Sequence, residues 1–208
     1  MFIDRRDAAI QLSYALAKYK DCNGIVMAIP RGGVPLGYII ANTLHLPLEL
    51  ILAKKIGHPL NREYAIGSVT LTGITADPRV SDVDPAYIIE EGTRIQEEIK
   101  RRYTLFTGKT YSPNVKGKII ILVDDGIATG STLMAAVIEL RKKVPAKIVI
   151  AVPVAPPEAA ERFKKIADDY ICLLEPDHFE GIGQFYKDFG EVTDDDVMSI
   201  LKKSKGEQ

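Results

Sequence analysis

One stretch of the chain, residues 119–132, constrains the fold more than any other part of the sequence. It opens with five apolar residues, Ile119–Val123, most of them β-branched, which predict a buried strand. Two adjacent carboxylates, Asp124 and Asp125, follow, and a loop of small residues then leads into a helix predicted over 131–142. A strand, a glycine-containing loop and a helix in direct succession are typical of an α/β protein with a parallel sheet.

The two acids stand where α/β proteins bind their ligands. At the carboxyl end of a parallel strand the chain turns back outside the sheet, so Asp124 and Asp125 are expected at the crevice there. Carboxylates accept hydrogen bonds from vicinal hydroxyls, and they also hold hydrated divalent cations. The pair is therefore predicted to bind sugar hydroxyls and to take part in a metal site, mostly through water and ligand oxygens.

The loop after the acids is predicted to bind phosphate. Its glycines and Ala128 allow the backbone to come close to a ligand. Unpaired amides and the positive end of the helix dipole favour a dianionic group at the start of the predicted helix. Three hydroxyls add donors, and the predicted substrate-binding set of this segment is Gly126, Ile127, Ala128, Thr129, Gly130, Ser131 and Thr132. A ribose 5-phosphate would fit, with its hydroxyls on the acids and its phosphate on the loop.

Other nucleotide-binding motifs agree less well with this segment. A Walker A loop has the form G-x-x-x-x-G-K-[ST] and a Rossmann fingerprint has the form G-x-G-x-x-G, and neither pattern occurs here. A receiver-type phosphoacceptor or a Walker B site would explain paired acids after a strand. Neither of them explains the T-G-S-T sequence that follows at 129–132.

A second glycine loop follows the first predicted strand, Gly24–Ile29. Gly32 and Gly33 would expose backbone amides to an anion where a helix opens, and Arg31 would add a fixed positive charge. One such loop is weak evidence, because glycine is the default turn residue. Two such loops on neighbouring strands of one sheet indicate a ligand with phosphates at both ends.

Two lysines, Lys54 and Lys55, come directly after the next predicted strand, Leu48–Ala53. Basic residues at the carboxyl end of a strand reach the same crevice, and lysine offers a point charge to phosphate oxygens there. Side chains alternate along an extended chain, so one of the two lysines is expected to face the site. His58 fits a loop ligand and a solvated histidine about equally well.

The aromatic tail, residues 175–191, is the least specific candidate. Phe179 and Tyr186 are predicted to stack on the ring of an acceptor molecule, with Phe185 as a further possibility. The alternative is that these rings pack the tail onto the sheet, which ordinary burial preferences favour.

Strands and helices alternate along most of the chain. This alternation predicts an α/β fold with a doubly wound, mostly parallel sheet flanked by helices. Further strands are predicted at Ile66–Leu71, Lys147–Val154 and Tyr170–Leu174, and further helices from about Asp4 to Tyr19 and over Val34–Leu44, Tyr87–Phe106, Pro157–Ile166 and Asp194–Lys202. Residues 1–208 are expected to form a single domain with an insertion at 72–110 that carries a long helix and a small hood at 175–208.

Composition excludes several classes of protein. A chain of 208 residues can bury a sizeable α/β core, and a net charge of −1 argues against a general nucleic-acid-binding surface. The sequence has no apolar run of about 18 residues and no signal-peptide core, so a cytoplasmic protein without a membrane partner is expected. Cys22 and Cys172 are too few for a disulfide framework.

The segment Val123–Thr132 reads V-D-D-G-I-A-T-G-S-T and resembles the phosphoribosyl pyrophosphate (PRPP) motif of the type I phosphoribosyltransferases at every position that the motif restricts. The resemblance implies that Asp124 and Asp125 bind the ribose hydroxyls and that the following loop binds the 5-phosphate. It also implies Mg²⁺ as cofactor and a homodimer. The loop near Arg31 would grip pyrophosphate, often through a non-proline cis peptide that would fall near Arg31–Gly32.

The acceptor is narrowed only by Ala128. Members that use 6-oxopurines carry an acid at the corresponding position, whereas adenine and orotate members resemble this chain in having a small or apolar residue. The resemblance therefore disfavours an oxopurine acceptor.

The leading hypothesis is transfer of the 5-phosphoribosyl group of PRPP to a nitrogenous base or related small-molecule acceptor, with release of pyrophosphate. The predicted catalytic residues are Arg31, Lys54, Lys55, Asp124 and Asp125. Two alternatives keep the same site: a PRPP-sensing regulatory protein without transferase activity, and a hydrolase that uses water as the acceptor. Nucleic acid is not an expected partner.

Overall fold

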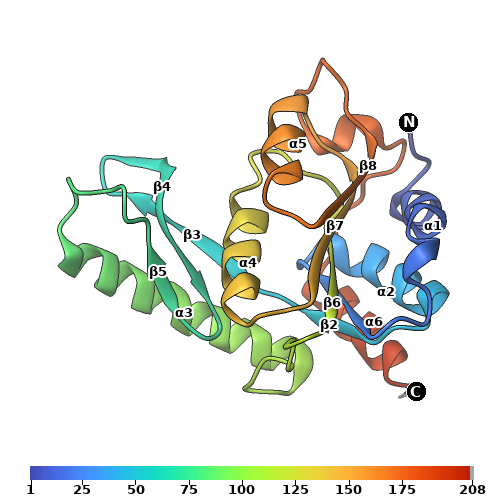
Figure 1. Cartoon of the computed structure of the whole chain (residues 1–208), viewed down its shortest axis with the longest axis horizontal. Coiled ribbons are helices and arrows are strands. Elements are labelled where there is room, and N and C mark those ends of the chain that lie inside the picture. The colour runs from blue at the N-terminus through green and yellow to red at the C-terminus, as the bar shows by residue number, and fades with distance from the viewer. Residues whose placement is uncertain (207–208) are drawn as a thin grey trace.

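The computed structural model describes residues 1–206 and contains a five-stranded sheet and a separate three-stranded sheet (Figure 1). The larger sheet has the order β2-β1-β6-β7-β8, and all of its strand pairs are parallel. Its strands are β1 (Gly24–Ala28), β2 (Leu48–Leu50), β6 (Ile119–Val123), β7 (Lys147–Val154) and β8 (Asp169–Leu174). The last two residues of the predicted tail, 207–208, lie outside the described residues.

The central strands are apolar because both of their faces are covered. Every residue of β1 is buried, and so is every residue of β6 after the first. A parallel sheet covered on both faces requires nearly continuous apolar strands, which the sequence supplies. In the register of this pair Ala28 lies opposite Val123, so the two strands end side by side. The loops that follow them therefore start next to each other.

Helices pack on both faces of the parallel sheet, as predicted. On one face lie α1 (Arg5–Ala15), a short 3₁₀ helix η1 (Ala17–Tyr19) and α2 (Gly33–Leu44), which share a core with alternate residues of β1, β6 and β7. On the other face lie α4 (Ser131–Lys142) and α5 (Pro157–Lys164), which contact the remaining residues of the same strands. The doubly wound α/β prediction is therefore confirmed.

The smaller sheet and one long helix form an arm, residues 53–107, which extends from the parallel sheet beyond α4 (Figure 1). Its strands β3 (Ala53–His58), β4 (Asn61–Thr70) and β5 (Ile74–Ala76) are antiparallel. The helix α3 (Pro85–Thr107) packs on them around a buried apolar cluster of Ile56, Ile66, Val69, Val83, Ile88, Ile95 and Ile99.

The arm corrects the sequence prediction after residue 50. The strand predicted over Leu48–Ala53 ends at Leu50, and the lysines predicted in a loop lie in β3 instead. The polar K-K pair concealed this strand, because an antiparallel strand with one covered face alternates and does not read as a continuous apolar run. The long helix predicted in the insertion is present, within a larger unit that includes the hairpin.

The tail, residues 175–206, returns to the amino terminus. A short 3₁₀ helix η2 (Ile182–Phe185) leads to a parallel bridge between Phe2 and Tyr186. The last helix, α6 (Asp194–Ser204), begins at the predicted cap Thr193, whose hydroxyl accepts from the amide of Asp196. None of the described helices is both long and apolar enough to span a membrane.

The arm core generates a stability prediction. Replacing Ile99, which is 1% exposed, with alanine should leave a cavity between α3 and the small sheet and lower the free energy of unfolding by about 2–4 kcal/mol. Ile89 on the same helix is 64% exposed, so Ile89→Ala is a matched control with an expected change of less than about 0.5 kcal/mol. Urea unfolding measures both, and equal effects would contradict the packing of α3 on the sheet.

Candidate functional site

Two loops meet at the carboxyl end of the parallel sheet because β1 and β6 are neighbours. A Cβ atom at Gly32 would lie 2.0 Å from Oδ2 of Asp125, and one at Gly33 would lie 2.6 Å from the carbonyl oxygen of Val123. Only glycine permits contacts this close. The structure thus brings the predicted glycine loop directly against the predicted acid pair.

The glycine loop differs in detail from the prediction. The amide of Gly33 donates to the carbonyl of Ile29 at 3.0 Å, so it is engaged within the loop and does not face an anion. The non-proline cis peptide expected near Arg31–Gly32 is present one bond earlier, between Pro30 and Arg31. The glycines therefore act mainly through close packing, and Arg31 remains the charged group of the loop.

The two acids have different surroundings. Asp125 is 8% exposed, and its Oδ2 accepts from Nε of Arg5 at 2.9 Å and lies 2.8 Å from Nη2 of the same guanidinium. Asp124 is partly exposed, and its Oδ1 accepts from the amide of Asp125 at 2.9 Å. Asp124 also lines a cavity of about 170 Å³ with the loop 126–133 and Ile182 of the tail. Asp124 is thus the member of the pair that faces a ligand-sized space.

Burial changes the ionisation of both carboxyls. Desolvation and then the neighbouring charge of Asp125 raise the pKa of Asp124 well above its usual range. Desolvation also raises the pKa of Asp125, and the Arg5 guanidinium opposes that rise. The site therefore holds closely spaced acids with a single arginine as their ion-pair partner among the described contacts, an arrangement suited to a ligand that brings hydrogen-bond donors or a cation.

The loop after the acids has the geometry of a helix-start anion site. Gly130 adopts φ +72° and caps α4, and the hydroxyls of Thr129 and Ser131 lie 3.1 Å apart. The prediction that Ile127 binds substrate is wrong. Its side chain is 2% exposed in the sheet core and its amide donates to the carbonyl of Val154, so Ile127 supports the loop and offers no donor to a substrate. Arg162 of α5, which sequence reasoning missed, donates to the carbonyl of Thr129.

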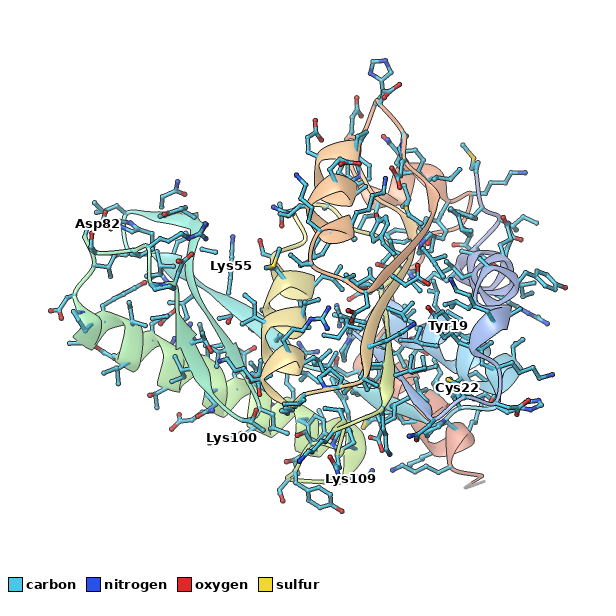
Figure 2. The ribbon with its side chains drawn as sticks, viewed as in Figure 1. Tyr19, Cys22, Lys55, Asp82, Lys100 and Lys109 are labelled. Carbon is cyan, nitrogen blue, oxygen red and sulfur yellow. The ribbon has the colours of Figure 1, made fainter. Side chains whose placement is uncertain are left out.

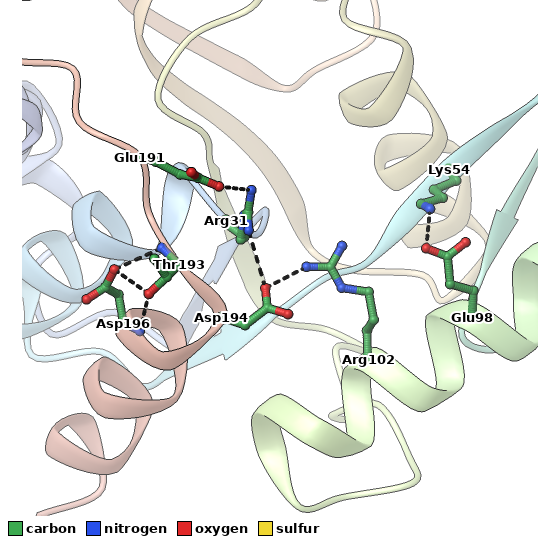
Figure 3. Close-up of polar contacts among 8 residues, drawn as sticks. All are labelled: Arg31, Lys54, Glu98, Arg102, Glu191, Thr193, Asp194 and Asp196. Atoms are coloured by element: carbon green, nitrogen blue, oxygen red, sulfur yellow. Dashed lines mark hydrogen bonds and ion pairs between the residues drawn. The ribbon is translucent and has the colours of Figure 1, made fainter.

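Lys54 and Lys55 point to opposite faces of β3, and each lines a cavity together with residues of the loop at 126–132. Lys54 forms an ion pair with Glu98 of α3 at 2.7 Å (Figure 3) and lines a cavity of about 50 Å³ with Pro30 and Thr132. Lys55 lies in the gap between the arm and α4 (Figure 2), where a cleft of about 640 Å³ is lined by Thr129–Ser131 and Arg162 among others. The sequence predicted that alternation would leave one lysine facing the site. In the structure the two side chains do alternate, but each of them adjoins a different part of the loop.

Arg31 is held by acids of the tail (Figure 3). Its guanidinium lies 2.8 Å from Oε1 of Glu191 and 3.7 Å from Oδ1 of Asp194. Asp194 in turn forms an ion pair with Arg102 of α3 at 2.9 Å. Neither acid carried a recognisable signal in the sequence, because they lie about 160 residues from Arg31 along the chain.

Tyr186 of the aromatic tail packs into the core, which is the alternative that burial preferences favoured, and does not face an acceptor. Tyr186 is 5% exposed between Phe2 and Phe189, and its hydroxyl donates to the carbonyl of Asp125 at 2.7 Å. It cannot stack on an acceptor, so that prediction is wrong for Tyr186. Phe179 stacks on Phe185 with ring centroids 5.6 Å apart. The tail residue that lines the cavity beside the acids is Ile182.

His58 is a structural residue of the hairpin and not a free loop ligand. It is 9% exposed, its Nδ1 accepts from the amide of Leu60 at 3.2 Å, and its Nε2 lies 3.5 Å from Oδ2 of Asp82. Among the side chains that the structure describes, which exclude that of residue 63, no cluster of three or more histidine, cysteine or acidic residues could hold a metal ion on its own. Both cysteines are free thiols.

Comparisons with known proteins identify the family to which this chain belongs. Residues 2–189 match the family model of the phosphoribosyl transferase domain, and the chain belongs to that family. Membership of this family indicates a transferase enzyme.

Two relatives show how far the similarity extends. A Mycobacterium tuberculosis protein that is provisionally named a phosphoribosyl transferase is 34% identical over 209 residues, which is 98% of this chain and 47% of that protein. The chain thus spans about half the length of this curated relative. The protein TT1426 from Thermus thermophilus, whose crystal structure is known, is 37% identical in sequence to this chain. The two structures superpose with a TM-score of 0.87 over 97% of this chain and 98% of TT1426.

The raised pKa of Asp124 predicts how the stability of the protein depends on pH. Because its pKa is higher in the folded protein than in the unfolded chain, the folded protein binds the proton more tightly, and stability falls as the pH rises above about 4 toward the raised pKa. At pH 7 Asp124→Asn should therefore raise the free energy of unfolding, because the amide carries no charge that burial must desolvate. Calorimetry should find a higher Tm.

The matched control for this prediction is Asp177→Asn, at an exposed position of the tail. It should leave Tm within about 1–2 °C of the wild-type value, because surface substitutions usually change stability little. The gain from Asp124→Asn should also disappear at low pH, where the wild-type carboxyl is protonated. A lower Tm for Asp124→Asn at pH 7 would contradict the assignment.

Proposed function

We propose that this chain transfers the 5-phosphoribosyl group of PRPP to a nitrogen atom of a small-molecule acceptor and releases pyrophosphate. The observation that carries the proposal is the juxtaposition at the ends of β1 and β6, where Asp124, the phosphate loop at 126–132 and the Arg31 loop adjoin one another. A ligand with hydroxyls between two phosphate groups matches this order of chemical groups.

Each part of PRPP has a proposed partner. The 5-phosphate would lie on the backbone and hydroxyls of 129–132 at the start of α4. The ribose hydroxyls would donate to Asp124. The pyrophosphate would be bound by Arg31 and Lys54, since Lys54 lines a cavity with Pro30 and Thr132, and Arg31 follows Pro30 in the chain. Lys55 would face the outer side of the phosphate loop from the cleft beside the arm.

Magnesium fits this donor set only together with the substrate. Asp124 is a hard oxygen donor with room beside it, but no third acidic group among the described side chains lies close enough to complete a protein-only site. Mg²⁺ keeps several waters and prefers phosphate oxygens with one or two carboxylates. We therefore propose that Asp124 holds the ion, mostly through water, when PRPP brings its own oxygens; the bound ion would neutralise charge on the departing pyrophosphate.

In the proposed reaction the lone pair of the acceptor nitrogen forms a bond to C1 of the ribose. The bond from C1 to the pyrophosphate oxygen breaks, and its electron pair leaves with pyrophosphate. Arg31 and Lys54 would stabilise that developing negative charge, and the proton released from the acceptor would pass to solvent. Asp124 would orient the ribose, and its negative charge would favour the positive charge that develops on the ring.

The acceptor is proposed to lie between the acids and the tail. Ile182, Gly126 and Asp124 line one cavity there, and Ile182 presents an apolar surface to it. Ala128 is exposed beside this cavity and carries no acid. An acceptor that needs a carboxylate partner at this point, as the oxopurine resemblance would require, is therefore disfavoured.

The function is tested by measuring pyrophosphate release from PRPP and Mg²⁺ with a panel of nitrogenous bases. Wild-type protein should release pyrophosphate with at least one acceptor. Lys54→Ala should reduce kcat/KM by about tenfold or more, because the positive charge that stabilises the departing pyrophosphate is lost. Lys20→Ala removes an exposed lysine of the opposite sheet end and is the matched control.

The outcomes separate the alternatives. Binding of PRPP without turnover for any acceptor would favour the regulatory alternative, and pyrophosphate release with water alone would favour the hydrolase. Retained Mg²⁺-dependent PRPP affinity after replacing both Asp124 and Asp125 with asparagine would overturn the site itself. The homodimer, the cytoplasmic location and the single domain over 1–208 stay predictions.

The ion pair between Arg31 and Glu191 generates a second prediction about ligand binding. If Arg31 binds pyrophosphate, Glu191 competes with the ligand for the same guanidinium. Glu191→Gln should then lower the Kd for pyrophosphate by about three- to tenfold, because the competing charge is removed. Glu180→Gln, at an exposed position of the same tail, is the control, and isothermal titration measures both. Weaker binding by Glu191→Gln would show that Glu191 orients Arg31 for the ligand.

A further inference from the structure

Arg5 joins three segments of the chain that lie far apart in the sequence. It is the first residue of α1, and its side chain is 14% exposed. Its guanidinium contacts Oδ2 of Asp125 through Nε at 2.9 Å and Nη2 at 2.8 Å, donates to the carbonyl of Gly190 at 2.7 Å, and lies 3.9 Å from the ring centroid of Phe189. One side chain thus links the amino-terminal helix, the acid pair and the tail.

Asp125 is enclosed on its other sides as well. The missing side chain of Gly32 leaves the space that the carboxylate occupies, since a Cβ there would lie 2.0 Å from Oδ2. The backbone of Asp125 donates to Asp124 and accepts from the hydroxyl of Tyr186. A planar guanidinium that engages a desolvated carboxylate in this way is costly to separate, because each partner would remain buried without its counter-charge.

The surroundings of Asp124 are different. Its carboxylate accepts from the amide of Asp125 and lines the cavity formed by the phosphate loop. In the described contacts Arg5 reaches Asp125 and not Asp124. The pair of adjacent acids is therefore asymmetric: one carboxylate is committed to an arginine and the other adjoins the ligand-sized space.

We propose that Arg5 is a positioning residue that fixes Asp125 as part of the wall of the site, so that Asp124 alone of the pair binds the sugar hydroxyls. This inference rests on the proposed function for the identity of the sugar phosphate. It departs from the equal roles that the sequence motif suggests for the two acids. The reason is geometric, since Oδ2 of Asp125 contacts the Arg5 guanidinium on one side and lies against Gly32 on another.

Arg5 also places the tail. Gly190, whose carbonyl accepts from Arg5, directly precedes Glu191, which forms the ion pair with Arg31. The ring of Phe189 lies under the same guanidinium and against Tyr186. One arginine thus sets the position of both the acid wall and the tail segment that holds the charged residue of the glycine loop.

The variants that test this role are Arg5→Gln, Arg5→Lys, Asp124→Asn and Asp125→Asn. Arg6→Gln is the matched control, because Arg6 is the next residue of the same helix and is exposed. The ligands are ribose 5-phosphate and its 2-deoxy and 3-deoxy forms, and the measured quantity is the ratio of the deoxy Kd to the ribose Kd for each variant.

Wild-type protein should prefer ribose 5-phosphate over at least one deoxy form by about tenfold, the usual worth of a hydrogen bond to a charged group. Asp124→Asn should reduce that ratio to near one, whereas Asp125→Asn and Arg5→Gln should keep the ratio while weakening all ligands about three- to tenfold. Arg5→Lys should recover part of the loss, because it keeps the charge without the planar two-point contact. A ratio near one for Asp125→Asn would overturn the proposal, since it would place that carboxylate on the sugar.

A double-mutant cycle distinguishes positioning from general stabilisation. If Arg5 acts through Asp125, then Arg5→Gln should weaken ribose 5-phosphate binding about three- to tenfold in the wild-type background and by less than twofold when Asp125 is already asparagine. A merely structural role would lower Tm and leave the Kd unchanged well below Tm. Equal loss in both backgrounds would overturn the link to Asp125.

A readout without ligand separates this inference from the proposed function. Hydrogen exchange of the ligand-free protein should show faster exchange over 186–192 in Arg5→Gln than in Arg6→Gln, because the contact with Gly190 is lost. If wild-type protein binds no sugar phosphate, the proposed function fails while the exchange result still reports on Arg5. Unchanged exchange over 186–192 would overturn the placement of the tail by Arg5.

Discussion

The contact between Gly32 and Asp125 is the constraint on which the rest of the site depends. Because β1 and β6 end in register, the loops that follow them start side by side, and a glycine at 32 lets them touch. This contact holds the glycine loop against the acid pair and closes one side of Asp125. The loop at 126–132 then continues from the end of β6 into α4, and it lines one cavity together with Asp124.

The charged side chains near the acid pair and the glycine loop form two separate groups of ion pairs. Arg5 pairs with Asp125, Arg31 with Glu191 and Asp194, and Arg102 with Asp194. The pair at Asp125 is largely buried and is costly to separate, whereas the pairs of Arg31 are half-exposed and cost less to separate. The tail is therefore held more firmly at Arg5 than at Arg31.

The sequence predicted the parallel sheet well because its strands are buried on both faces and its helices are long. The helix over 131–142 and the strand Lys147–Val154 agree with the prediction residue for residue. The prediction failed in the hairpin of the arm, where Lys54 and Lys55 interrupt the apolar pattern of β3, and in the tail, where the ring of Tyr186 gave no indication of which surface it covers. Both errors concern contacts with distant segments, and local pattern carries little information about such contacts.

The sequence by itself determined the α/β class, the loop that caps α4 and the presence of two acids at the end of β6, because these depend on hydrophobic period and on residues within one short segment. Only the tertiary structure decided which contacts each of the two acids makes. Arg5 lies 120 residues from Asp125, and Glu191 lies 160 residues from Arg31. Contacts between segments so far apart in the sequence depend on how the whole chain packs. Local sequence pattern therefore could not predict which charged side chains pair.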